Sequence, residues 1–197
     1  MSAADRAPVI EACVLAAGRG SRMGAAKHLL ALEGVPLLER VVRALSRTSV
    51  ARISVVLAPG DVDGRALAAR LGAIPLEAES ADEGRAASVR AGVRAVRADS
   101  AGLLFALADQ PFLAPEDFER LLAEFRANPS SIVRAQYGEA AGSPVVFARG
   151  YFAELLELRG REGGRSVIAR HPDAVRAVDL PPAHGRDLDR PEDWPRQ

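Results

Sequence analysis

Short apolar runs alternate with amphipathic segments along this chain of 197 residues. Apolar runs rich in Val, Leu and Ile are typical of buried strands, whereas apolar positions three and four residues apart are typical of helices that cover a sheet. The pattern predicts strands over 12–16, 52–58, 73–78, 102–108, 130–137, 143–149 and 174–180. It predicts helices over 36–48, 63–71, 82–98, 114–127, 150–160 and 163–171, with arginines on the polar face of the third.

Strands and helices that alternate in this way form βαβ units, so the predicted fold is α/β with a mostly parallel sheet covered on both faces. No linker rich in Pro, Gly or Ser and no internal repeat divides the chain, which predicts a single domain over 1–197. The two strands after residue 130 follow each other closely. They are predicted to form a small two-stranded insertion, as a lobe over one side of the cleft.

Charge and composition exclude several classes of partner. Lys and Arg together number 26 and so do Asp and Glu, so no overall field attracts nucleic acid or an anionic membrane. The one cysteine, Cys13, cannot form an internal disulfide, which indicates a reducing compartment. The start MSAADRAPVIEA does not resemble a signal peptide, and no stretch approaches the roughly 18 apolar residues of a membrane span. We therefore expect a soluble, cytoplasmic protein.

The segment LAAGRGSRMGAAKHLL, residues 15–30, directly follows the first predicted strand. Its glycines let backbone N–H groups approach an anion closely, and Arg19, Arg22 and Lys27 add three positive charges. Ligands of open α/β sheets bind at the carboxyl ends of the strands, which is where this loop lies. The loop is therefore predicted to bind more negative charge than one carboxylate carries, and a triphosphate fits.

Three other interpretations explain this loop less well. A flexible turn with solvated charges leaves its position at a strand end unexplained. The dinucleotide fingerprint G-x-G-x-x-G is one residue shorter than the G-x-G-x-x-x-G found here, and no acid ends the second strand to bind a ribose. A phosphate-loop NTPase requires G-K-[ST], whereas Lys27 is followed by His28 and Leu29.

Residues 15–27 resemble, throughout, the signature L-A-[AG]-G-x-[GS]-x-R-M-G-x-x-K of nucleotidyltransferases that transfer a nucleoside monophosphate from an NTP. Five further segments extend the resemblance along nearly the whole chain: EGVPLLERVV, EGRAASVRAGV, LADQPFL, GSPVVFAR and RDLDRPEDW. This set is most similar to the molybdenum cofactor cytidylyltransferases. The resemblance implies a Rossmann-like, three-layer α/β/α nucleotidyltransferase fold, with a nucleotide-binding part at about 9–110 and an acceptor-binding part at about 111–190.

The same resemblance implies a set of site residues. Lys27, Arg22 and Asp109 would be catalytic, and Asp109 and Asp189 would hold Mg²⁺ or Mn²⁺, with Asp187 as the other candidate ligand. The implied nucleotide-binding residues are Leu15, Ala16, Ala17, Gly18, Arg19, Gly20, Arg22, Lys27, Gly84 and Ser88. The implied acceptor-binding residues are Gln110, Ser143 and Arg165, although Ser143 replaces the His or Asn that is usual in the family.

The residues themselves leave part of this open. Asp109 follows the most strand-like run and Asp187 and Asp189 follow the last strand, but an aspartate at a strand end also serves as a helix or turn cap. Asp117, close after a predicted helix start, is interpreted as a helix-start charge. A phosphate monoester is mostly dianionic near neutral pH, so it can attack phosphorus without a base. The three histidines, His28, His171 and His184, are therefore interpreted as surface or structural residues.

The resemblance implies transfer of CMP from CTP to the phosphate of molybdopterin, with release of pyrophosphate. The partners would be CTP or another NTP, a phosphate-bearing pterin, and a molybdoenzyme or its chaperone. Ala17 stands where the guanylyl branch has glycine, and its methyl group leaves less room for a purine. One alternative is transfer to another acceptor: guanylyl transfer to molybdenum cofactor, or transfer to a sugar phosphate or methylerythritol phosphate, although enzymes of the last kind carry H-D-A-A-R-P where this chain has LADQPF. The other is a non-catalytic chaperone that binds nucleotide or cofactor.

Overall fold

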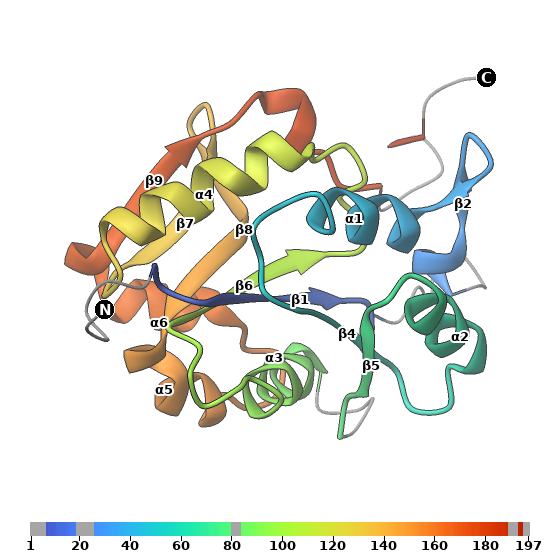
Figure 1. Ribbon diagram of the computed structural model, residues 1–197, viewed down its shortest axis with the longest axis horizontal. Coiled ribbons are helices and arrows are strands. Elements are labelled where there is room, and N and C mark those ends of the chain that lie inside the picture. Colours follow the sequence, from blue (N-terminus) through green and yellow to red (C-terminus); the bar gives the residue numbers. More distant parts are fainter. Residues whose placement is uncertain (1–6, 19–25, 80–83, 189–192, 195–197) are drawn as a thin grey trace.

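The computed structural model describes residues 7–18, 26–79, 84–188 and 193–194, and its centre is a seven-stranded sheet (Figure 1). The strand order is β5-β4-β1-β6-β8-β7-β9. The first four strands in this order are parallel to one another: β5 (Ile74–Glu77), β4 (Ile53–Leu57), β1 (Ile10–Leu15) and β6 (Gly102–Leu107). Their carboxyl ends therefore meet at one edge of the sheet, where ligands of such sheets bind.

The other half of the sheet contains the two strands expected after residue 130. They are β7 (Ile132–Tyr137) and β8 (Ala140–Ala148), and β8 lies antiparallel between β6 and β7. The last strand, β9 (Val175–Asp179), pairs parallel to β7. The prediction of a separate lobe here is therefore wrong, because the apolar β8 pairs with β6 along its buried half and extends the central sheet.

Helices cover both faces of the sheet, as Figure 1 shows, which confirms the predicted three layers. One face packs against α1 (Leu37–Leu45), α2 (Val62–Arg70) and α4 (Pro115–Ala127). The other packs against α3 (Gly84–Arg94), α5 (Phe152–Leu156) and α6 (Gly164–Arg170). The alternation of side chains along each strand divides the core, so that Val14 joins the first cluster and its neighbour Cys13 the second.

The small two-stranded sheet of this fold lies elsewhere than predicted. It is formed by β2 (Ala31–Leu32) and β3 (Val35–Pro36), which pair antiparallel directly after the short 3₁₀ turn η2 (Lys27–Leu29). Two-residue strands are too short to show a hydrophobic period, so the sequence pattern carries no signal for them. No helix in the described part of the chain is long and apolar enough to cross a membrane.

Candidate active site

Lys27 and Asp109 meet at the carboxyl edge of the parallel strands. Lys27 begins η2, and Asp109 lies two residues beyond the end of β6. The Lys27 Nζ atom donates a hydrogen bond of 2.6 Å to Oδ2 of Asp109, and their side chains are 13% and 28% exposed. The N–H of Ala108 donates to the carbonyl of Leu15, so the chain after β6 runs beside the end of β1. Two residues predicted to be catalytic, 82 positions apart, thus form one ion pair.

A buried histidine supports the turn that carries Lys27. His28 is only 5% exposed, and its Nε2 atom lies 2.8 Å from Oδ2 of Asp61. The other carboxylate oxygen of Asp61 accepts a hydrogen bond of 2.9 Å from the N–H of Gly64 and caps α2. A Cβ on Gly64 would lie 2.5 Å from Asp61 Oδ2, so glycine permits this close packing. His28 therefore connects the Lys27 turn to the start of α2, in agreement with a structural role.

The position of His28 predicts a pH-dependent stability. Burial lowers the pKa of the His28 imidazole below its ordinary value of 6.5, and Asp61 raises that pKa by a smaller amount. The unfolded chain then binds the proton more tightly than the folded chain does. The stability that buried, neutral His28 contributes is therefore complete above about pH 6.5 and is lost as the pH falls below it. The free energy of unfolding can then change by up to about 1.4 kcal/mol per pH unit. Urea unfolding between pH 5 and pH 8 should show a weaker pH dependence for His28→Gln than for the wild type. Equal dependence in both proteins would contradict this assignment.

The segment after β9 returns to Asp109. The N–H of Leu188 donates a hydrogen bond of 3.1 Å to the backbone carbonyl of Asp109. Leu188 is fully buried against Leu32 and Leu37, which fixes this return. Asp187 is exposed next to it, whereas Asp189 lies outside the described residues. The structure therefore brings one of the two predicted aspartates after β9 to the edge where Asp109 lies.

The carboxylates at this edge suit a divalent cation that is shared with a phosphate ligand. Mg²⁺ is usually bound by one or two carboxylates together with phosphate oxygens and water, rather than by a cage of protein ligands. Asp109 is partly exposed and Asp187 is exposed, so both carboxylates are accessible from solvent. In the described ranges no group of three or more His, Cys, Asp or Glu side chains could hold a metal by itself. The two carboxylates therefore fit a cation that takes its remaining ligands from substrate phosphate oxygens and water.

The predicted nucleotide-binding residues lie on two neighbouring segments. Leu15, Ala16, Ala17 and Gly18 run along the end of β1 and beyond it, while Gly84 and Ser88 belong to α3. The Ala17 side chain packs against the apolar cluster formed partly by α3, whereas the buried Ala16 packs on the opposite face of the sheet. Arg19, Gly20 and Arg22 lie outside the described residues. The structure thus brings the two segments of the predicted nucleotide site together.

The predicted acceptor-binding residues are less concentrated. Gln110 is buried beside Asp109, and its Nε2 atom donates a hydrogen bond of 3.5 Å to the carbonyl of Gly185. Ser143 lies near the start of β8. Because β8 is antiparallel to β6, its start lies at the carboxyl edge of the parallel strands, and so does Ser143. Arg165 is exposed in the first turn of α6, and within the described residues no hydrogen bond or ion pair joins it to Asp109. Gln110 adjoins Asp109 in the chain, and Ser143 lies at the same edge of the sheet.

Tyr137 is a feature of this edge that the sequence pattern does not indicate. Its hydroxyl donates a hydrogen bond of 2.7 Å to the carbonyl of Ser143. Burial raises the pKa of Tyr137 far above its ordinary value, and the charges of Asp117 and Asp187 raise that pKa further. Asp117 accepts a hydrogen bond from the N–H of Ala114 at the start of α4, which confirms its interpretation as a helix-start charge. Tyr137 is thus bonded to the start of β8 and is close enough to Asp117 and Asp187 to feel their charges.

Comparison with known proteins identifies the family of this chain. The sequence pattern of the MobA-like NTP transferase domain matches residues 12–175, which include Lys27 and Asp109. The chain belongs to the MobA-like NTP transferase family. The match extends over the parallel half of the sheet and the β7–β8 pair, and it begins inside β1 and ends at the first residue of β9.

Several relatives align with nearly the whole chain. The molybdenum cofactor guanylyltransferase of Rhodobacter capsulatus is 31% identical over 95% of this chain and 97% of its own length. The purine catabolism protein PucB of Bacillus subtilis (strain 168) is 27% identical over 96% of each chain. The crystal structure of Rv0371c from Mycobacterium tuberculosis H37Rv has a TM-score of 0.84 at 27% identity, covering 95% of this chain and 96% of that one. Rv0371c has also been crystallised as a complex with manganese.

Proposed function

We propose that this MobA-like NTP transferase transfers CMP from CTP to the phosphate of molybdopterin and releases pyrophosphate. The observation that carries the proposal is the Lys27–Asp109 pair, which lies where the turn that begins at Lys27, the end of β6 and the Asp187–Leu188 return meet. The loop is predicted to supply cationic and backbone donors to the triphosphate, and the aspartates the ligands of a cation. The neighbouring Gln110 and Ser143 would bind the acceptor, with Arg165 as a third contact.

The proposed reaction depends on charge and position. When bound between Asp109 and either Asp187 or Asp189, Mg²⁺ or Mn²⁺ would neutralise negative charge on the phosphates. Lys27 would supply a second, fixed positive charge from the protein, and Arg22 would bind two phosphate oxygens at once. The acceptor phosphate is already a dianion near neutral pH and needs no base. The protein's remaining task is to hold the two substrates in line, and binding energy supplies that orientation.

The choice of CTP rests on Ala17. Its side chain packs toward α3, the helix whose Gly84–Ser88 segment is proposed to bind the nucleobase. A methyl group at this position reduces the space available to a purine. The guanylyltransferase of R. capsulatus is a relative of this chain, so guanylyl transfer is the second candidate within the same chemistry.

Replacing Ala17 with glycine should raise the use of GTP relative to CTP. One methyl group in a pocket changes discrimination by about 1–3 kcal/mol, so the shift in the ratio of kcat/KM should be modest. Ala12→Gly is the matched control, because it removes the same group from the buried middle of β1, away from the carboxyl edge. Kinetics with both nucleotides would measure the ratio. An unchanged ratio in Ala17→Gly would move the selectivity to another part of the site.

A pyrophosphate-release screen tests the proposed function directly. The four NTPs are each combined with molybdopterin, a sugar phosphate or methylerythritol phosphate, in the presence of Mg²⁺ or Mn²⁺. Release that requires CTP and molybdopterin together supports the proposal, whereas release with GTP or another acceptor identifies one of the related reactions. Nucleotide binding without turnover for any acceptor would favour a non-catalytic chaperone.

A further inference from the structure

The loop between α5 and α6, residues 157–163, is docked on the first turn of α3. The carbonyl of Gly160 accepts a hydrogen bond of 3.2 Å from the N–H of Ala86, one of the first-turn donors that no carbonyl of the same helix can satisfy. Gly84 has a φ of +64°, and a Cβ there would lie 2.9 Å from the same carbonyl. A Cβ on Gly163 would lie 2.8 Å from Cδ of Arg85. The loop thus completes the start of a helix that is remote from it in sequence.

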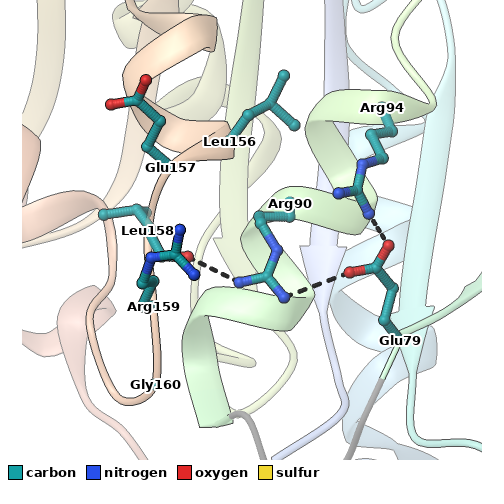
Figure 2. A pocket seen from close by; sticks show the side chains of 8 residues that line it. All are labelled: Glu79, Arg90, Arg94, Leu156, Glu157, Leu158, Arg159 and Gly160. Carbon is teal, nitrogen blue, oxygen red and sulfur yellow. Dashed lines mark hydrogen bonds and ion pairs between the residues drawn. The ribbon is translucent and has the colours of Figure 1, made fainter.

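Arg90 connects α3 to this loop by a hydrogen bond. It belongs to a helix predicted to carry its arginines on a polar face, yet it is only 8% exposed. As Figure 2 shows, it extends from α3 toward the loop, where Nη1 donates a hydrogen bond of 2.7 Å to the carbonyl of Leu158. Nη2 lies 3.3 Å from Oε2 of Glu79. Since Arg90 is four residues after Ala86, both lie on the same face of the helix and both hold the loop.

The cavity beside Arg90 does not itself indicate a ligand. It has a volume of about 400 Å³ and is lined by residues of α3, of the end of α5 and of the loop, together with Glu79. Glu79 forms ion pairs with both Arg90 and Arg94, so the carboxylate already compensates charge on these two arginines (Figure 2). We therefore interpret these side chains as a connection between α3 and the 157–163 loop rather than as an anion-binding site.

We propose that Arg90 is a positioning residue that couples nucleotide binding to the 157–163 loop. The inference rests on the proposed function, in which Gly84–Ser88 binds the nucleobase. A nucleobase that orders this segment also favours the conformation of Ala86 to which Gly160 is bonded. By reciprocity, a docked loop favours nucleotide binding by the same factor. The loop continues directly into α6, whose first turn carries Arg165, so the acceptor side of the site is ordered with it.

Hydrogen exchange with and without nucleotide tests this coupling. The probe is a non-hydrolysable CTP analogue with Mg²⁺, and the readout is amide protection in peptides that cover 157–163. In the wild type, nucleotide should increase this protection. In Arg90→Ala the increase should be lost and the nucleotide Kd should rise roughly tenfold, within the usual range of coupling between sites. Turnover at saturating substrate should change much less than Kd, because Arg90 is placed to act through the loop.

Arg94→Ala is the matched control. Arg94 lies one turn further along α3 and pairs with the same Glu79, but within the described residues no hydrogen bond joins it to the loop. It should keep both the protection and the affinity of the wild type. Arg90→Lys retains the charge without the two-pronged geometry and should lie between the wild type and Arg90→Ala. If Arg90→Ala does not fold, as judged by its thermal unfolding, the Arg90→Lys protein decides the question.

The outcomes separate this inference from the proposed function. Nucleotide binding to the wild type without any change at 157–163 would overturn the coupling and leave the proposed function standing. Equal damage from Arg90→Ala and Arg94→Ala would also overturn it, since the effect would then come from Glu79. A wild-type protein that binds none of the four NTPs would overturn the proposed function and this inference with it.

Discussion

Asp109→Asn is expected to lower turnover by several orders of magnitude while the protein remains folded. The side chain is partly exposed, and the backbone carbonyl that accepts the Leu188 N–H is unchanged in the variant. Asparagine therefore preserves the size and the backbone contact of the residue but removes the negative charge. That charge pairs with Lys27 and is proposed to hold the cation, so the loss is that of a charge clamp worth several kcal/mol in the transition state.

Pyrophosphate release at saturating CTP and acceptor measures the effect of Asp109→Asn. Asp99→Asn is the control, because Asp99 is an exposed carboxylate that pairs with Arg97 on the surface. It should retain wild-type turnover. Circular dichroism and thermal unfolding should show that both variants are folded. A folded Asp109→Asn protein that releases pyrophosphate at a near-normal rate would remove Asp109 from the catalytic assignment.

The strands and helices that define the parallel half of the sheet could be predicted from the sequence. The runs that become β1, β4 and β6 are short, apolar and separated by amphipathic segments, which is the pattern of strands buried on both faces. The meeting of Lys27 and Asp109 follows from the same pattern, because both follow parallel strands whose carboxyl ends lie at one edge. Sequence separation is no obstacle where the topology itself brings residues together.

What could not be predicted depends on pairing and on long-range contacts. The run that becomes β8 is equally apolar whether it pairs with β6 or forms a lobe, and a local pattern does not determine which strand is its neighbour. The resemblance of RDLDRPEDW implies that this segment returns to Asp109, but the packing of Leu188 against Leu32 and Leu37, which fixes the return, does not follow from a local pattern. Arg90 occupies a polar position of an amphipathic helix, and only the loop that covers it makes it buried.

Lys27→Ala is expected to raise the KM for CTP and to lower kcat. The Lys27 side chain is 13% exposed and its ammonium is held at the strand edge by Asp109, so its charge acts in a partly desolvated place where electrostatic interactions are strong. Facing the β- and γ-phosphates, it would stabilise both the bound triphosphate and the departing pyrophosphate, and for this reason both constants should change. Lys27→Arg should recover only part of the activity, because a planar guanidinium does not replace a compact ammonium.

Arg19→Ala provides the comparison for Lys27→Ala. The family signature fixes arginine at position 22 and lysine at position 27 but allows any residue at position 19, so Arg19 is predicted to lie at the rim. Its removal should cost about 0–1 kcal/mol, as for an exposed ion pair. The double variant Lys27→Ala with Asp109→Asn should lose less than the sum of the single losses, because the two side chains form one pair. Steady-state kinetics on these variants decides the matter: if Arg19→Ala were as damaging as Lys27→Ala, the division of the loop into central and rim charges would be wrong.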